Sequence, residues 1–369
     1  MDGNWDGLRA DVRQMIDELI ASGRESGVQV AAYLDGGPIV TVQAGVADRD
    51  TGRELGADTP IWSASTGKVL TSTVVHVLAE RGELDYDLRI ADVWPEFARH
   101  GKDRVTLRHA LTHTAGVPAL PADVTPEDFT DWDRMCALLA DAEPIAPAGE
   151  VKAYHAWTFG WLVGEVVRRV TGRRISQVLA EDVAGPLGVA DELYLGVPAA
   201  ELGRLARVED RNMAALFDYA SANLPNFDRV APSGVRPGAQ IGSRADVLAA
   251  DVPATGTMTA RAAARMLAAL IGEVDGVRLI SPARMREAAT LDGPPGPEWV
   301  FGQETTWGLG YAVDGDGSFG AAGSGGSLAY AYPELGLTIA ATKTLLAAGD
   351  GDPMEDVRVL IRDRVAASR

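Results

Sequence analysis

Residues 61–71 read I-W-S-A-S-T-G-K-V-L-T, an apolar strand end that runs directly into an apolar helical pattern. Ser65 precedes Lys68 by three residues, so a helix would place the hydroxyl and the amine on one face, one turn apart. A lysine buried in a medium of low dielectric loses its proton more easily than in water, and it can then accept the serine proton. The stretch therefore predicts a nucleophilic serine with a lysine base. Taken alone, it also suits an N-capped helix with a solvent-facing lysine.

The composition is that of an ordinary globular protein, large enough for one big domain or two intertwined ones. The chain has 369 residues, of which 46% are hydrophobic and 23% charged. Its formal net charge of −18, from 52 acidic and 34 basic residues, argues against nucleic acid or an acidic membrane surface as a partner. The first residues lack a basic and then apolar leader, and no run reaches the roughly 18 apolar residues of a membrane span. We expect a cytoplasmic protein and leave its oligomeric state open.

Metal and cofactor chemistry find no support in the sequence. Cys136 is the single cysteine, which excludes an intrachain disulfide and a thiolate metal cluster. The histidines lie at positions 76, 100, 109, 113 and 155, and none of them shows a ligand spacing such as H-E-x-x-H. We therefore expect no metal and no cofactor.

Hydrophobic periodicity predicts strands at both ends of the chain and helices between them. Strand patterns lie at 28–34, 39–47, 307–313, 327–332 and 337–343. Helical patterns lie at 5–22, 259–271 and 354–367, and residues 67–205 are also mostly helical in pattern. The turn at residues 35–38, D-G-G-P, makes the first two strands a hairpin.

This order of elements predicts an α+β fold with a split domain. We expect residues 1–64 together with 240–369 to form an antiparallel sheet flanked by helices. Residues 65–239 would then be an inserted, mainly helical domain.

Three further segments carry candidate site residues. Tyr154 lies at a helix entry, where its phenol could relay protons in a cleft, although a lone tyrosine is more often an aromatic residue that fills the core. The glycine-rich run 319–327 precedes a strand and could bring a backbone N–H to a carbonyl oxygen, or it could be a plain turn. His113, in L-T-H-T-A-G, is interpreted as a buried histidine whose ring is satisfied by backbone groups.

Together these segments resemble the serine β-lactamase-like superfamily, in the branch of class C β-lactamases, DD-peptidases and family VIII carboxylesterases. Ser65 to Lys68 matches the S-x-x-K motif, Tyr154 matches the tyrosine of Y-x-N, and residues 321–323 fall where the family has K-T-G or H-x-G. L-T-H-T-A-G (111–116) and G-T-M-T-A-R (256–261) resemble the esterase branch. The resemblance covers nearly the whole chain, with the motifs in order.

The resemblance implies a β-lactamase/transpeptidase-like fold with the active site in the cleft between the two parts. Ser65, Lys68 and Tyr154 would be catalytic, and the backbone N–H groups of Ser65 and Ser324 would form the oxyanion hole. The substrate-binding residues that we expect in this cleft are His155, Trp157, Ala321, Gly323 and Gly325.

Two positions depart from the family pattern. Ala156 stands where Y-x-N has asparagine, and Ala321 stands where the third motif has lysine or histidine. In the family that basic group helps to hold the carboxylate of a β-lactam or peptide. Its loss costs an anionic substrate a bond of roughly 1.5–3 kcal/mol, whereas a neutral ester loses nothing there. Both departures favour esters or acyl transfer.

The sequence therefore predicts a serine hydrolase that acts through an acyl-enzyme, as a carboxylesterase on neutral small-molecule esters. An acyltransferase that passes the acyl group to an alcohol or amine of a specialised metabolite would use the same catalytic residues. A non-catalytic ligand-binding relative is disfavoured by the intact Ser65, Lys68 and Tyr154. A β-lactamase or D-Ala-D-Ala peptidase is disfavoured by Ala321.

Overall fold

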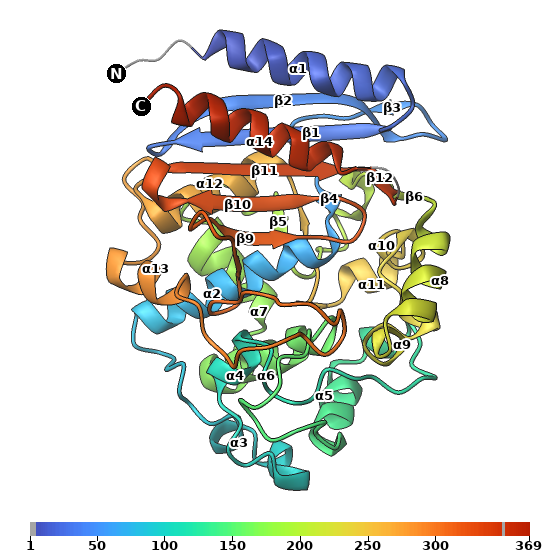
Figure 1. Ribbon diagram of the computed structural model, residues 1–369, viewed down its shortest axis with the longest axis vertical. Coiled ribbons are helices and arrows are strands. Elements are labelled where there is room, and N and C mark those ends of the chain that lie inside the picture. The colour runs from blue at the N-terminus through green and yellow to red at the C-terminus, as the bar shows by residue number, and fades with distance from the viewer. Residues whose placement is uncertain (1–4, 349–350) are drawn as a thin grey trace.

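A seven-stranded antiparallel sheet joins the two ends of the chain (Figure 1). The computed structural model describes residues 5–348 and 351–369. Strand β1 (Gly27–Leu34) forms the predicted hairpin with β2 and pairs on its other side with β11 (Leu337–Lys343). The strands lie in the order β3-β2-β1-β11-β10-β9-β8. The other five strands of this sheet span β2 Gly37–Asp48, β3 Arg53–Glu54, β8 Ala312–Val313, β9 Phe319–Ala322 and β10 Leu328–Tyr332.

Helices cover both faces of the sheet, as predicted. Helices α1 (Asp6–Ala21) and α14 (Pro353–Ala366) lie on one face, and α12 (Ala260–Ile271) lies on the other (Figure 1). Successive side chains of a strand point to opposite faces. In β1, Val28, Val30 and Ala32 accordingly join the core under α1 and α14, whereas Ala31 and Tyr33 join the core on the α12 side. Burial on both faces explains why the whole of β1 is apolar except for Gln29.

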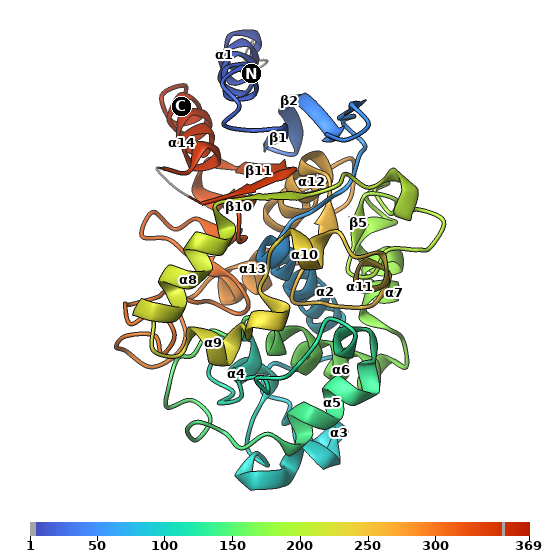
Figure 2. The ribbon, with the colours of Figure 1, turned by 90° about the vertical axis from the view of Figure 1, so that its right-hand side faces the viewer.

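The predicted helical part lies beyond α12, around helix α2 (Lys68–Glu80) (Figure 1). Nearly every residue of α2 is buried, so its first turn is held between the sheet and the other helices. The helices of this part and of the segments that return to the sheet are α3 Ile90–Val93, α4 Leu107–Leu111, α5 Trp132–Asp141, α6 Thr158–Thr171, α7 Ile175–Val178, α8 Met213–Asn223, α9 Phe227–Val230, α10 Ala239–Gly242, α11 Ala245–Ala249 and α13 Pro282–Ala288. Figure 2 shows α8 and α9 next to each other at one flank of the molecule, between the sheet and the lower helices.

Two small sheets connect the segments that we assigned to different domains. Strands β4 (Ile61–Trp62) and β5 (Leu193–Tyr194) pair with β7 (Thr257–Met258), and β6 (Glu209–Arg211) runs parallel to β12 (Leu345–Ala347). The division into residues 1–64 with 240–369 and residues 65–239 stays a prediction.

Two predicted strand limits are wrong. The strand expected at 307–313 is reduced to Ala312–Val313, because the backbone turns at Gly310 with a φ of +82°. A side chain at Gly310 would overlap Ser72 of α2, so this bend lets the chain pass close to that helix. Conversely, Phe319–Ala322 is strand β9 and not part of a turn, because it pairs with Leu328–Ala331 of β10. The turn itself is confined to the glycines and Ser324 that follow.

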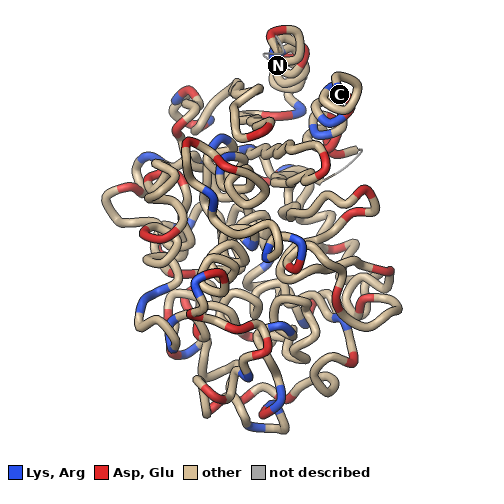
Figure 3. The backbone as a smooth tube through the Cα atoms, turned by 90° about the vertical axis from the view of Figure 1, so that its left-hand side faces the viewer, with Lys and Arg blue, Asp and Glu red and all other residues tan. Residues whose placement is uncertain are grey.

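Acidic and basic residues are interspersed along the whole molecule (Figure 3). Within the described ranges, none of the helices is both long and apolar enough to span a bilayer.

Candidate active site

Ser65 lies in a strained turn between β4 and α2. After Trp62 the chain enters a 3₁₀ turn, Ala64–Gly67, and Ala64 adopts a φ of +44°, which is rare for a residue with a side chain. The N–H of Ser63 donates to the Gly256 carbonyl at 2.8 Å, which ties the turn to the loop before β7. Ser65 is thus held at the first turn of α2 but outside its regular part, and it lines a cavity.

Lys68 is buried beside this serine, and it forms no ion pair with any carboxylate of residues 5–348 and 351–369. Its Nζ donates to Ser65 Oγ at 3.1 Å and to the carbonyls of Ala156 at 2.8 Å and Ala254 at 3.0 Å. Burial disfavours the ammonium form and lowers the pKa of Lys68 to about 7. Near neutral pH a substantial share of Lys68 is therefore an uncharged amine that can accept a proton from Ser65.

Tyr154 completes the constellation from the segment before α6. Lys68 Nζ lies 5.0 Å from the centre of its ring. Burial raises the pKa of the Tyr154 phenol to about 12, while its hydrogen bond to Ser65 acts in the opposite direction. Tyr154 is therefore a protonated phenol at neutral pH, and it lines the same cavity as Ser65.

Ring contacts with Trp307 and the buried His113 hold the half-buried Tyr154 ring in place. The ring is stacked on Trp307 at a centroid distance of 5.5 Å, and it contacts His113 at 4.9 Å. His113 is 1% exposed, and its Nδ1 accepts the backbone N–H of His155 at 3.2 Å. This confirms the interpretation of His113 as a buried histidine with a backbone partner.

The glycine turn after β9 packs directly against the nucleophile turn. A side chain at Gly323 would overlap the Ser63 carbonyl oxygen and lie 2.7 Å from Thr66 Oγ1. Thr66 Oγ1 in turn donates to the Ser327 carbonyl at 2.9 Å. Only glycine allows this approach, which brings Ser324 to the same cavity as Ser65.

A cavity of about 650 Å³ opens in front of Ser65. Apolar and aromatic side chains dominate its wall, and no charged residue of the described chain is part of its lining. The aromatic residues that line it are Tyr154, Trp157, Phe217, Phe227, Phe301, Trp307 and Tyr330. They come from the segment before α6, from α8 and α9, from the chain between α13 and β8, and from β10. The site therefore suits an uncharged, apolar ligand.

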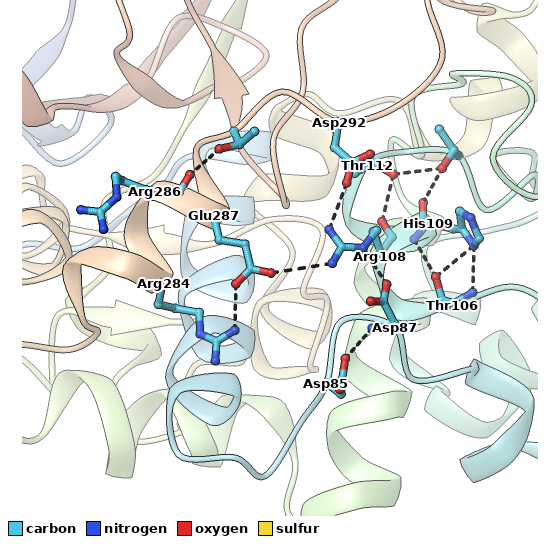
Figure 4. A network of polar contacts seen from close by, with 12 residues as sticks. Asp85, Asp87, Thr106, Arg108, His109, Thr112, Arg284, Arg286, Glu287 and Asp292 are labelled. Atoms are coloured by element: carbon cyan, nitrogen blue, oxygen red, sulfur yellow. Dashed lines mark hydrogen bonds and ion pairs between the residues drawn. The ribbon is translucent and has the colours of Figure 1, made fainter.

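Figure 4 shows Arg108 between Asp87 and Asp292, in a network of ion pairs that joins α4 to the loop after α13. Arg108 of α4 pairs with Asp87 at 2.7 Å and with Asp292 at 3.0 Å. The backbone N–H of Asp292 donates to the Trp307 carbonyl at 2.8 Å. The network thus links the helical part to the loop whose tryptophan stacks on Tyr154.

The structure brings four of the predicted site residues to the cavity, namely Ser65, Tyr154, Trp157 and Ser324. Lys68 lies beside Ser65 but does not line the cavity. Gly323 lies behind the turn that carries Ser65. Gly325 is buried against Leu346 of β12 and does not line this cavity.

Two residues that we expected to bind substrate do not line the cavity. His155 is fully buried, and its ring bonds to the Ala153 carbonyl and to the N–H of Val117, so it cannot contact a ligand. Ala321 packs into the core, and its neighbour Ala322 lines the cavity instead. The reason is the alternation of side chains along β9.

Sequence reasoning named Trp157, Phe217 and Trp307 as possible wall residues but missed other parts of the apolar wall. Val300 and Phe301 lie in W-V-F after a Pro/Gly-rich stretch that predicted only a loop. The signal available was the run of large apolar residues in a segment without strand or helix periodicity, which a solvated loop would not carry.

Comparison with known proteins places this geometry in a family. The Beta-lactamase family model matches residues 12–363. The chain belongs to the beta-lactamase family. It is 36% identical, over 86% of its length and 76% of the other protein, to "Esterase/beta-lactamase LipL" of Mycobacterium tuberculosis.

Solved structures agree with this assignment. A family VIII carboxylesterase superposes with a TM-score of 0.84 at 30% identity and covers 96% of this chain and 97% of its own. A penicillin-binding protein homologue from Caulobacter crescentus superposes with a TM-score of 0.82 at 32% identity and covers 95% of both chains. The predicted β-lactamase/transpeptidase-like fold is confirmed, and the protein is a serine hydrolase.

Proposed function

We propose that this protein is a carboxylesterase that cleaves neutral, apolar esters through an acyl-enzyme on Ser65. The observation that carries the proposal is the cavity in front of Ser65, which is large, apolar and free of charged lining residues among those described. A carboxylate in such a wall would lose its hydration without gaining a cation.

In the proposed mechanism, Lys68 is the base and Tyr154 relays the proton. Ser65 Oγ attacks the ester carbonyl as its proton passes to the neutral amine of Lys68, whose pKa of about 7 suits this task. The backbone N–H groups of Ser65 and Ser324 stabilise the oxyanion. The phenol of Tyr154 donates a proton to the departing alkoxide and regains one from Lys68, which leaves the acyl group on Ser65. Water then attacks the acyl-enzyme by the reverse proton path and releases the acid.

The same geometry favours esters over β-lactams. A β-lactam carries a carboxylate, and Ala321 and Ala322 supply no cation for it. The missing charge-assisted bond is worth about 1.5–3 kcal/mol, or one to two orders of magnitude in affinity. The name of the Mycobacterium tuberculosis relative joins both activities, so β-lactam hydrolysis belongs in the test.

Transfer of the acyl group to an alcohol is a second candidate activity. The apolar wall that excludes charged ligands also favours an apolar alcohol over water as the acceptor. Four of the relatives are named as acyltransferases, at 23% to 26% identity over less than half of this chain.

Intact-mass spectrometry tests both candidates. We expect p-nitrophenyl esters to add the mass of their acyl group to the protein, and an added alcohol to divert the product to a new ester if transfer competes with hydrolysis. Ser65→Ala abolishes turnover and fluorophosphonate labelling, whereas the neighbouring control Ser63→Ala, whose hydroxyl bonds the Ile61 carbonyl, retains both. Labelling that persists at another serine in Ser65→Ala contradicts the proposed nucleophile. Rapid cephalosporin hydrolysis contradicts the proposed preference for neutral esters.

A further inference from the structure

A buried carboxylate lies next to the proposed proton relay but takes no part in it. Glu298 is 1% exposed, and it is absent from the ion pairs formed within residues 5–348 and 351–369. Instead, its two oxygens accept backbone N–H groups: Oε1 from Tyr154, and Oε2 from Val300 at 2.8 Å and Phe301 at 2.7 Å. A buried carboxylate is costly unless its lone pairs are satisfied, so these three contacts account for its presence.

The three contacts join two functional parts of the site. On one side is Tyr154, the proposed proton relay. On the other side are Val300 and Phe301, which line the cavity, and Phe301 also packs against the Tyr154 ring at 5.8 Å. Backbone hydrogen bonds also hold this loop: the N–H of Glu298 donates to the Gln303 carbonyl, and the N–H of Trp299 donates to the Lys152 carbonyl. The loop of residues 298–303 is therefore hydrogen-bonded to the segment that carries Tyr154, and the Glu298 carboxylate contacts both.

We propose that Glu298 is a positioning residue that sets, through one carboxylate, both the place of Tyr154 relative to Ser65 and the shape of the cavity wall at Phe301. The proposal rests on the proposed function of Tyr154. In this proposal, the carboxylate that aligns the proton relay at Tyr154 also determines which apolar substrate groups fit the cavity. Burial raises the pKa of Glu298 above its usual value, and its three backbone donors together with the nearby charge of Lys152 offset this effect only in part.

Glu298→Gln is the sharpest variant because it keeps the size of the side chain. A carboxylate accepts on both oxygens, but an amide offers one oxygen and one NH₂ group, which cannot accept an N–H. The variant must therefore lose either the hydrogen bond from the Tyr154 N–H or those from the N–H groups of Val300 and Phe301. Glu165→Gln is the matched control, because Glu165 is also a fully buried carboxylate, held by Trp132, Arg168 and Arg169 away from the cavity.

Kinetics on a short and a long ester separate positioning from simple loss of stability. With p-nitrophenyl acetate, kcat of Glu298→Gln should fall by about 10- to 100-fold, the usual cost of a small misplacement in the site. The ratio of kcat/KM for p-nitrophenyl octanoate to that for the acetate should fall by about threefold or more, because the wall at Phe301 loosens. Glu165→Gln should lose thermal stability and keep both values. A wild-type kcat and chain-length ratio in folded Glu298→Gln would overturn the proposal.

Hydrogen exchange provides a readout that does not depend on catalysis. The amides of Tyr154, Val300 and Phe301 should be protected in the wild type. In Glu298→Gln, either the Tyr154 amide or those of Val300 and Phe301 should exchange faster, whereas Glu165→Gln should leave all three protected. If the wild type shows no esterase activity, the proposed function fails, yet this measurement still decides whether Glu298 holds the two segments together. Unchanged protection of all three amides in Glu298→Gln refutes it.

Discussion

At the scale of the residue, the surroundings of Lys68 support the proposed reactivity of the tetrapeptide at 65–68. Its ammonium group is buried among carbonyl oxygens and Ser65, and it has no carboxylate partner within the described ranges. Among the other buried lysines, Lys343 shows a contrast, because it forms a buried ion pair with Glu25. A charge that lacks a counter-ion is destabilised by burial, which lowers the pKa of Lys68 to about 7.

The first prediction follows from this pKa. Only neutral Lys68 can accept the Ser65 proton, so kcat/KM for a neutral ester should fall as the pH drops through about 7. Well below that value the decline should be about tenfold per pH unit, as for a single ionisation. A pH–rate profile with a substrate that does not titrate measures it. A flat profile between pH 5 and 8 contradicts the proposed base.

The second prediction concerns the proton relay as a unit. Lys68→Ala and Tyr154→Phe should each lower kcat by about 10²–10⁴, the usual scale for lost acid–base help. The double variant should lose less than the product of the two, because both residues serve one transfer. Single-turnover kinetics with folded protein, checked by circular dichroism, measure these losses. If Tyr154→Phe is as active as the wild type, Tyr154 is only a packing residue.

At the scale of the element, β9 and the turn that follows it bring two parts of the site together. Gly323 allows the turn to touch the chain around Ser65, and the alternation of β9 decides which alanine faces the cavity. Both features depend on the pairing of β9 with β10, which sets the register of the strand.

The third prediction tests this close approach. Gly323→Ala places a methyl group against the Ser63 carbonyl and Thr66, so the turn must move away from the nucleophile. We expect kcat to fall by about 10²–10³, the cost of losing one oxyanion-hole donor, with a smaller effect on KM. Gly315→Ala is the control, because a side chain at Gly315 meets no other atom within 4 Å. Equal kinetics for the two variants would show that the turn does not set the oxyanion hole.

The fourth prediction distinguishes the two alanines of β9. Ala322→Lys puts an ammonium group at the cavity, so the ratio of kcat/KM for an anionic ester to that for a matched neutral ester should rise about tenfold if about 1.4 kcal/mol of pairing is gained. Ala321→Lys instead buries a charge in the core and should lower the melting temperature. Paired kinetics and thermal melts check both outcomes. A larger gain in the ratio from Ala321→Lys would reverse this assignment of the two sides of the strand.

At the scale of the whole molecule, the charge distribution adds to the selectivity of the cavity. The net charge of −18 comes from acids that are interspersed with bases over the molecule (Figure 3). Its field repels an anionic substrate at long range, whereas a neutral ester does not feel it.

The fifth prediction uses salt to reveal this repulsion. Raising the ionic strength from about 0.01 M to about 0.15 M shortens the screening length from about 30 Å to about 8 Å. The kcat/KM of the wild type for an anionic ester should therefore rise several-fold, while that for the neutral ester stays constant. Steady-state kinetics in a salt series measure this, and an equal response of both esters contradicts it.

The sequence by itself determined what depends on short-range spacing and periodicity. The N-terminal hairpin, the helices at both ends and α12 follow from local patterns, and Ser65 with Lys68 is a spacing within one turn. The motifs, taken in order, also determined the family and the α+β fold. The strand at 307–313 failed because its glycines bend the backbone toward α2, a contact that no local pattern records.

Only the tertiary structure decided what depends on contacts between distant segments. The cavity wall combines residues near 154, 217, 301 and 330, and nothing in their sequence separation predicts that they meet. Whether Ala321 or Ala322 faces the cavity depends on the register of β9, and the burial of His155 depends on Val117, 38 positions earlier. The lowered pKa of Lys68 also depends on the tertiary structure, because the segments that pack around the amine keep water away from it.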